Sequence, residues 1–200
     1  MHPVLADLNR NFKFTLVSGS PRRRELLRGL GLRFTVKKPD VEEKIRPAHY
    51  RQDIVRTALA KINSVPCRAG QILIACDTLV VCGGRVLGKP RSPAEAARFL
   101  HLLSGRKHTV LSCAAVKTIT QTQYKIVETR VYFRRLADAE ITAYVRSGLP
   151  EDKAGAYGIQ EIGGLFVRRI EGCYYNVVGL PVSVLIDMLT SLQKKEQKKK

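Results

Sequence analysis

A run of ten mostly apolar residues constrains the fold of this 200-residue chain more than any other feature. Residues 72–81, ILIACDTLVV, have the length and composition of a buried central strand, yet they contain a single carboxylate. A carboxylate is costly to bury unless it is paired, protonated or bound to a metal. Asp77 is therefore a candidate functional group, and the alternative is an Asp at a strand bulge that is bonded to the backbone.

The pattern around this run predicts a mixed α/β fold. After a strand at residues 12–17, Ser20 suits a helix N-cap, Pro21 the first helical position and Gly31 the helix exit. Further helices are expected at residues 49–65, 92–105, 138–146 and from about 181 to 193; further strands are expected at 34–37, 85–87, 108–116, 124–133, 165–170 and 174–178. We expect a mixed twisted sheet with flanking helices, in two lobes around a central cleft.

Composition narrows the class of protein. Residues 1–193 are expected to form one domain and residues 194–200, KKEQKKK, a basic disordered tail. The apolar stretches are too short to span a bilayer, and residues 1–13 lack the layout of a secretory signal. Five cysteines without a CxxC pair predict neither a disulfide framework nor a zinc ribbon, so a cytoplasmic location is expected.

The net charge makes a polyanion the first candidate partner. Lys and Arg total 35 and Asp and Glu 17, a formal charge of +18, which would attract nucleic acid at long range. Five of the lysines lie in the last seven residues. The most informative basic cluster is instead the triplet at residues 22–24.

That triplet lies in a segment with the features of a phosphate site. In Ser18-Gly19-Ser20-Pro21-Arg22-Arg23, a predicted strand leads through a glycine turn into a helix N-terminus, where free amides and the helix dipole favour an anion. The hydroxyls of Ser18 and Ser20 and the guanidiniums of Arg22 and Arg23 add donors. The segment is not a Walker A loop. The alternative is a capped surface helix, although basic residues in its first turn oppose the dipole.

Other polar residues have weaker patterns. Glu42 and Glu43 are an acidic pair that, with Asp77 and a triphosphate, would suit Mg²⁺, or they belong to a solvated loop. Lys61 lies in a predicted helix, where lysine is ordinarily just exposed, and Lys89 lies in a constrained turn. Two more candidates, Lys153 and Gln160, border a glycine-rich loop that would either approach a ligand closely or act as a flexible connector.

Six segments together resemble the Maf family of nucleoside triphosphate pyrophosphatases, which is related in fold to the inosine triphosphate pyrophosphatases. They are residues 18–27 (SGSPRRRELL), 75–78 (ACDT), 88–90 (GKP), 103–105 (LSG) with His108, 152–160 (DKAGAYGIQ) and 176–181 (NVVGLP). Each motif is weak alone, but the six occur in the order and spacing of the family, over residues 14–189.

The resemblance implies an activity and a set of roles. The family cleaves a nucleoside triphosphate between the α and β phosphates and needs a divalent metal, Mg²⁺ or Mn²⁺. By resemblance, Asp77 is the proton acceptor for water and lies close to the metal, with Glu42 or Glu43 assisting. The implied substrate-binding residues are Ser18, Ser20, Arg22, Arg23, Lys61, Lys89 and Lys153.

The resemblance also narrows the substrate. The segments around Arg22, Thr78 and Gln160 are similar to the branch described as acting on dTTP and UTP, and an amide suits a pyrimidine edge. The alternatives are a 7-methyl-GTP or other modified-nucleotide pyrophosphatase and, in another class, a basic nucleic-acid-binding or septum-formation regulator. A single triphosphate suits the basic cluster better than nucleic acid does, and a homodimer is expected by resemblance alone.

Two departures from the family pattern are visible. Cys76 precedes Asp77, and Ser112-Cys113 stands where Thr-Gly is usual. Neither is expected to contact a proposed phosphate ligand.

Overall fold

The computed structural model describes residues 3–197, with the backbone alone described for the last three. The helices are α1 (Pro3–Asn11), α2 (Pro21–Gly29), α3 (Tyr50–Asn63), α4 (Pro93–Leu103), α5 (Asp138–Arg146), α6 (Tyr174–Val178) and α7 (Val182–Gln197), with 3₁₀ turns η1 (Pro47–His49), η2 (Ala154–Ala156) and η3 (Ile162–Phe166). The strands are β1 (Lys13–Val17), β2 (Phe34–Lys37), β3 (Gln71–Cys82), β4 (Arg85–Leu87), β5 (Lys107–Lys117), β6 (Thr122–Phe133) and β7 (Val167–Glu171).

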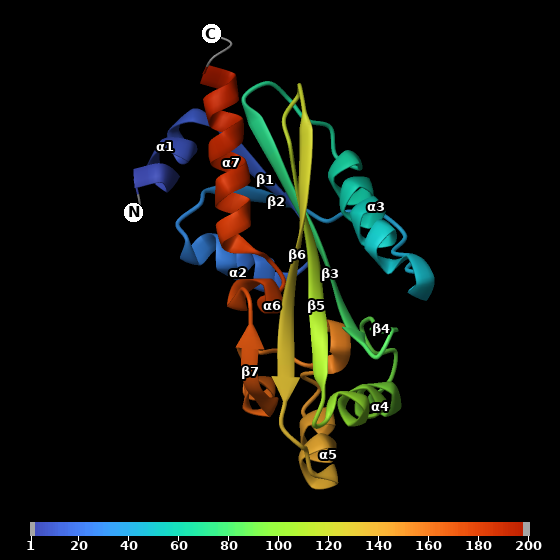
Figure 1. The fold of residues 1–200 in the computed structure, drawn as a ribbon. Helices are drawn as coiled ribbons and strands as arrows, with labels where there is room; N and C mark the ends of the chain where they lie inside the picture. Colours follow the sequence, from blue (N-terminus) through green and yellow to red (C-terminus); the bar gives the residue numbers. More distant parts are fainter. Residues whose placement is uncertain (1–2, 198–200) are drawn as a thin grey trace.

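The strands form one mixed sheet in the order β2-β1-β3-β5-β6-β7, with β4 paired to β3 (Figure 1). Strands β2, β1 and β3 are parallel, and the remaining pairs are antiparallel. The expected mixed sheet with flanking helices is therefore confirmed. The long strands β3, β5 and β6 run through both halves of the molecule (Figure 1).

Strand β3 is continuous, but its pairing changes along one edge. On that edge β1 pairs with residues 71–75 and β4 pairs with residues 80–82, while β5 covers the opposite edge at residues 73–81. Among the described strands, nothing pairs with residues 76–79 on the first edge. The sheet is thus open between β1 and β4, beside Asp77.

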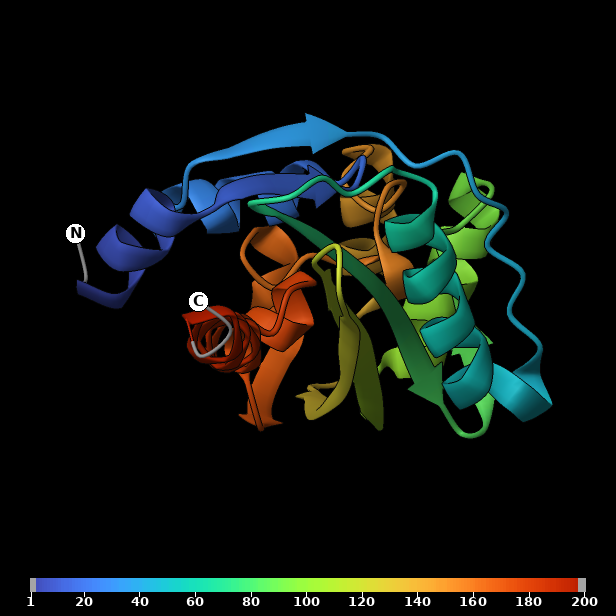
Figure 2. The same cartoon turned by 90° about the horizontal axis from the view of Figure 1, so that it is seen from above.

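Alternation along β3 separates the helices by face. Ile72 and Ile74 pack with apolar residues of α1, α2 and α7, whereas Leu73 and Ala75 pack with α3. Figure 2 shows α3 on one side of the sheet and α7 on the other. Beyond the gap, Val80 belongs to a third cluster that includes residues of α4 and α5. The upper half is therefore a helix–sheet–helix sandwich, and the lower half has a core of its own.

Most predicted elements are present, but one prediction was wrong. Residues 174–178, YYNVV, form helix α6 rather than the predicted strand. Asn176 explains the difference because its buried amide donates to the Val110 carbonyl and to Thr129 Oγ1, and Gly179 then ends the helix at φ 122°. Four of these five residues are aromatic or β-branched and satisfy a strand pattern, and only these tertiary contacts select the helix.

The chain ends also differ from expectation. Helix α1 was not predicted; it buries Leu5 and Leu8 in the core shared with α7, and Gln193 donates to the Asp7 carboxylate. Helix α7 continues to Gln197, so the first four residues of the predicted disordered tail are helical, and residues 198–200 lie outside the described residues. None of the described helices is long and apolar enough to cross a membrane.

Candidate functional site

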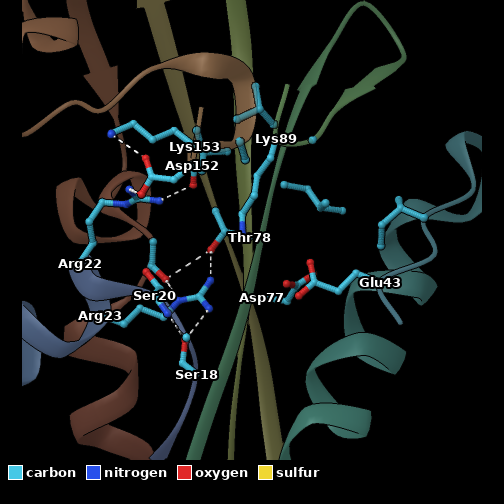
Figure 3. A pocket seen from close by; sticks show the side chains of 18 of the residues that line it. Ser18, Ser20, Arg22, Arg23, Glu43, Asp77, Thr78, Lys89, Asp152 and Lys153 are labelled. Atoms are coloured by element: carbon cyan, nitrogen blue, oxygen red, sulfur yellow. Dashed lines mark hydrogen bonds and ion pairs between the residues drawn. The ribbon is translucent and has the colours of Figure 1, made fainter. Parts of the chain in front are cut away.

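A cavity of about 1010 Å³ lies at the open edge of β3. It is lined by residues from the β1–α2 turn, the loop after β2, α3, the turn after β4 and the loop at residues 152–160. Adjacent β3 residues point to opposite faces of the sheet, so Asp77 faces α3 while Thr78 faces α2, and both reach the cavity (Figure 3). The break in strand pairing makes this double access available.

The side of the cavity next to α3 holds two carboxylates around one ammonium. Lys61 Nζ lies 2.6 Å from Asp77 Oδ1 and 2.6 Å from Glu43 Oε1. Both Lys61 and Asp77 are about 95% buried. Lys61 is therefore not the ordinary exposed helical lysine, and Asp77 has the partner that its burial requires. We name Asp77, Lys61 and Glu43 the carboxylate side of the cavity.

The structure distinguishes the two glutamates. Glu43 lines the cavity, while the exposed Glu42 pairs with Lys44 at 3.0 Å. Burial raises the pKa of Glu43, but Lys61, with help from Lys89 and Arg23, outweighs this and holds the pKa below its usual value. Glu43 is thus an anion in the site, and the prediction that included Glu42 as a metal ligand has no geometric support.

A buried aspartate holds the loop that carries Glu43. Asp53 accepts hydrogen bonds from the backbone and side chain of Arg46 and lies 3.1 Å from Arg56. Its pKa lies well below the usual value, chiefly because of the Arg46 side-chain bonds. The sequence analysis did not identify Asp53. Its spacing could have shown it, because Asp53 lies four residues before Thr57 and eight before Lys61 and therefore shares a helix face with both.

On the opposite side of the cavity, Arg23 is a buried structural anchor. Its guanidinium donates to the Gly179 carbonyl (2.8 Å), the Cys76 carbonyl (2.6 Å), Ser18 Oγ (3.2 Å) and Thr78 Oγ1 (3.0 Å). Four of the five N–H donors of an arginine are therefore engaged. Arg23 satisfies the open edge of β3 at Cys76 and joins α2 to the turn after α6.

Arg22, which precedes Arg23 in the chain, contacts Asp152 on the same side of the cavity (Figure 3). Its Nη1 donates to Asp152 Oδ2 at 2.6 Å, and its Nη2 donates to the Asp152 carbonyl at 2.9 Å. Asp152 was not among the predicted site residues. Its presence in a segment next to Lys153 could have drawn attention to it. We name Ser18, Ser20, Arg22, Arg23 and Asp152 the arginine side of the cavity.

The two serines differ in what they offer a ligand. Ser18 is buried, and its hydroxyl accepts from the Ser20 amide and from Arg23, each at 3.2 Å. Ser20 is the N-cap of α2 in position but makes no side-chain capping bond. Its hydroxyl has no hydrogen-bond partner within the described part of the chain and lines the cavity.

Lys153 is held by the protein rather than presented freely. It is about 95% buried and donates to the Leu149 carbonyl (2.7 Å) and Asp152 Oδ1 (2.8 Å), with Glu161 Oε2 at 3.1 Å. This location does not favour the predicted role in substrate binding.

The glycines of residues 152–160 allow the loop to pack closely against neighbouring side chains of the protein. Gly155 adopts φ 71°, and a Cβ there would lie 2.9 Å from Val80. Likewise, a Cβ on Gly158 would lie 2.7 Å from the Lys153 side chain. The Gly155 amide also donates to the Gly88 carbonyl at 3.0 Å, which fixes the loop beside Lys89. The loop is therefore neither a flexible connector nor, at these glycines, a ligand cradle.

Two exposed residues complete the lining. The Lys89 ammonium has no ion-pair partner among residues 3–194, and Gln160 makes one long 3.4 Å bond to Glu161. Thr78, in contrast, lies within 2.9 Å of Ser112 Oγ and accepts from Arg23. Position 76 does contact a proposed phosphate ligand, because its backbone carbonyl accepts from Arg23, so the expectation was wrong there. Ser112 contacts Thr78, which was predicted for specificity rather than for phosphate.

His108 supports the cavity from the lower core. Its Nε2 lies 2.8 Å from the hydroxyl of Tyr157, which lines the cavity, and its ring packs edge-on against Phe133. Burial lowers the pKa of His108 to about 3 and raises that of Tyr157. The histidine is therefore neutral near pH 7 and acts as a packing and hydrogen-bonding residue.

The carboxylate side suits a hard cation only in part. Within residues 3–194, no group of three or more His, Cys, Asp and Glu side chains could hold a metal ion. Asp77 and Glu43 converge on one ammonium and supply two carboxylates. Magnesium usually takes one or two carboxylates and completes its shell with waters and substrate phosphates. The donor set thus fits a metal that arrives with a phosphorylated ligand.

Comparison with known proteins agrees with this chemistry. A family model described as "Maf-like protein" matches residues 13–192. A dTTP/UTP pyrophosphatase of Moorella thermoacetica is 48% identical over 88% of this chain and 93% of its own length. One of Syntrophomonas wolfei is 43% identical over 87% and 94%, respectively. A HAM1 protein from Coxiella burnetii shares the fold, with a TM-score of 0.50 at 18% identity over 90% of this chain and 99% of that one.

Proposed function

Because this chain belongs to the Maf family, we propose that it hydrolyses dTTP and UTP to the monophosphate and pyrophosphate. The observation that carries the proposal is the buried Asp77–Lys61 pair with the half-exposed Glu43, which faces the basic β1–α2 turn across one cavity. The relatives that match over nearly their whole length are named for this reaction. The cavity volume also reaches the upper end of the usual range for small-ligand sites, about 1,000 Å³.

In the proposed reaction, water adds to the α phosphorus as the bond from that phosphorus to the α–β bridging oxygen breaks. Asp77 accepts the proton of the water, and pyrophosphate leaves. Lys61 holds Asp77 in place and adds positive charge beside the reacting group. The reaction depends on positioning and electrostatic stabilisation, which several fixed cations around one carboxylate provide.

Asp77 and Glu43 are the proposed protein ligands of a divalent metal, Mg²⁺ or Mn²⁺. When bound, such a metal neutralises phosphate charge and lowers the pKa of a coordinated water. Lys89 and Arg22 are the proposed phosphate ligands because both are basic residues that line the cavity. Ser20 adds a hydroxyl, while Ser18 and Arg23 hold the turn in shape.

Gln160 is the proposed base-recognition residue. It is exposed at the cavity, and its amide both donates and accepts hydrogen bonds, as a pyrimidine edge requires. Thr78 and Arg22 were also predicted to affect specificity. The Thr78 hydroxyl is engaged with Arg23 and Ser112, so its proposed effect on specificity is indirect.

The test is pyrophosphate release from a panel of triphosphates with added Mg²⁺ or Mn²⁺. The panel contains dTTP, UTP, dCTP, GTP and 7-methyl-GTP. We expect the activity to require the metal and kcat/KM to be higher for dTTP and UTP than for the other triphosphates. Preference for 7-methyl-GTP would support the alternative substrate, and no release from any triphosphate would contradict an enzymatic role.

A homodimer and a cytoplasmic location remain predictions, and the alternative of a nucleic-acid-binding regulator has a test of its own. A regulator that binds nucleic acid would show steep salt dependence that survives removal of residues 194–200, which an electrophoretic shift assay measures. A homodimer would appear by light scattering at twice the chain mass of 22.4 kDa. Cell fractionation tests the predicted cytoplasmic location.

A further inference from the structure

The arginine side of the cavity already contains an anion. Asp152 lies opposite Arg22, and its carboxylate takes one N–H of the guanidinium at 2.6 Å. The Arg22 side chain is only 16% exposed, while that of Asp152 is 51% exposed. The carboxylate therefore sits at the solvent side of the cavity, where it neutralises a cation that the proposed function assigns to phosphate.

The same carboxylate also contacts a second cation. Asp152 Oδ1 accepts from Lys153 at 2.8 Å, while Oδ2 accepts from Arg22. Burial raises the pKa of Asp152, but the contacts with Lys153 and Arg22 outweigh it, so the pKa lies below its usual value and the group is ionised near pH 7. One acid thus joins the β1–α2 turn to the loop at residues 152–160.

This ion pair does little to hold the two halves of the molecule together. Partly exposed ion pairs contribute little to the free energy of unfolding. Arg23 already joins α2, β3 and the turn after α6 through four hydrogen bonds, three of them buried. The orientation of Arg22 is also supported separately, because its Nη2 donates to the Asp152 backbone carbonyl. The carboxylate is thus dispensable for stability and for gross placement of Arg22.

We propose that Asp152 is a positioning residue that competes with the substrate's phosphates for Arg22. This inference rests on the proposed function. In the empty site, the carboxylate occupies one N–H of the guanidinium and balances its charge. When the triphosphate binds, a phosphate oxygen replaces Asp152 Oδ2, while the bond to the backbone carbonyl keeps Arg22 at the rim. The exchange suits arginine, because its guanidinium N–H groups form charge-assisted hydrogen bonds with carboxylate and phosphate oxygens alike.

Competition has an unusual signature: removing a polar group from the site strengthens binding. Asp152→Asn keeps the backbone carbonyl and removes only the competing charge. Lys153 retains the Leu149 carbonyl and Glu161. We expect the Kd for inorganic tripolyphosphate with Mg²⁺ to fall about three- to tenfold, measured by calorimetry, with a parallel fall in the KM for dTTP.

Loss of a negative charge would by itself improve the binding of an anion, so two controls are needed. Glu151→Gln makes the same charge change at the preceding, exposed position and should leave the Kd unchanged. Asp152→Asn made in an Arg22→Gln background should have no effect, because the cation under competition is absent. An equal effect in both backgrounds would overturn the proposal in favour of simple repulsion.

The remaining outcomes are also decisive. An unchanged or weaker affinity in Asp152→Asn overturns the proposal, as does failure of every variant to bind tripolyphosphate. Circular dichroism checks the fold, and Asp152→Ser, which also keeps the carbonyl, replaces the Asn variant if that one unfolds. If the native chain binds tripolyphosphate but releases no pyrophosphate from dTTP, the proposed function is wrong. The Kd of the Asp152→Asn variant for tripolyphosphate still tests the role of Asp152 in that case.

Discussion

The two sides of the cavity hold their charges in different ways. On the carboxylate side, Asp77 and Glu43 share Lys61, and the negative charge exceeds the positive. On the arginine side, Arg23 is fixed by four hydrogen bonds, whereas its neighbour Arg22 contacts one half-exposed acid. In the two proposals above, the carboxylate side carries out the reaction chemistry and Arg22 on the arginine side exchanges its anion with the ligand.

The largest expected effect lies on the carboxylate side. Asp77→Asn removes the proposed proton acceptor, and kcat for pyrophosphate release should fall about 10²- to 10⁴-fold. The amide still accepts a hydrogen bond from Lys61, so the melting curve should remain cooperative. Asp138→Asn, at a side chain that is 92% exposed, is the matched control and should be unaffected. Near-native kcat in Asp77→Asn would remove Asp77 from its proposed role.

Substitution of the adjacent arginines tests the contrast within the arginine side. Arg23→Lys should lower the free energy of unfolding by about 2 to 4 kcal/mol, because lysine cannot reproduce the planar set of buried bonds. Arg22→Lys should change it by less than about 1 kcal/mol and act mainly on KM. Urea unfolding of both variants measures the difference. Equal stability losses would show that the two arginines are not distinct in role.

The glutamate pair tests which acid belongs to the carboxylate side. Glu43→Gln should raise the Mg²⁺ concentration needed for half-maximal activity by at least about tenfold, since it removes a proposed ligand. Glu42→Gln should leave it unchanged because Glu42 pairs with Lys44 at the surface. A metal titration of both variants decides between them, and the reverse result would exchange their assignments.

A smaller effect is expected at the loop that carries Glu43. Asp53→Asn weakens the bonds to Arg46 and should lower the free energy of unfolding by about 1 to 3 kcal/mol. It should also raise the Mg²⁺ requirement a few-fold, through displacement of Glu43. Asp40→Asn, on the same loop but exposed, is the control. If Asp53 acts through Glu43, its effect on Mg²⁺ should vanish in a Glu43→Gln background.

The smallest effect is a pH dependence of the Glu43–Lys61 pair. The folded pKa of Glu43 lies below the unfolded value of 4.5, mainly because Lys61 outweighs the effect of burial. The stabilising contribution is therefore present above about pH 4.5 and is lost as the pH falls through the folded pKa. The difference in unfolding free energy between native protein and Glu43→Gln should be constant from about pH 7 to 5 and shrink below. Shrinkage that begins near pH 6 would contradict the lowered pKa.

Local patterns predicted the elements but not the contacts that complete the site. Hydrophobic runs and helix-stop signals placed β3, α2 and α4 within a few residues, since those signals are local. The helix at residues 174–178 was missed because it depends on the burial of Asn176 against β5 and β6. Asp152 was missed for the same reason, because its partner Arg22 lies 130 positions away in the chain.

Resemblance and spacing identified Asp77, Lys61 and Lys89 as cavity residues, and the structure places all three there. They could not separate residues that face the ligand from residues that face the protein. Ser18, Arg23 and Lys153 carry the right chemical groups, yet their donors and acceptors are used internally. The distinction depends on side-chain direction, which sequence spacing alone does not specify.

The continuity of β3 has a mechanical consequence. One twelve-residue strand crosses from the upper core to the lower core, and β5 pairs with it on both sides of the cavity. Between the cores there is consequently no loop hinge along this strand about which the halves could swing. We expect the cavity to widen and narrow by a change in the twist of the sheet, with small displacements spread over many residues. Amide hydrogen exchange should then be slow at those amides of residues 73–81 that bond to β5, even while the surrounding loops exchange.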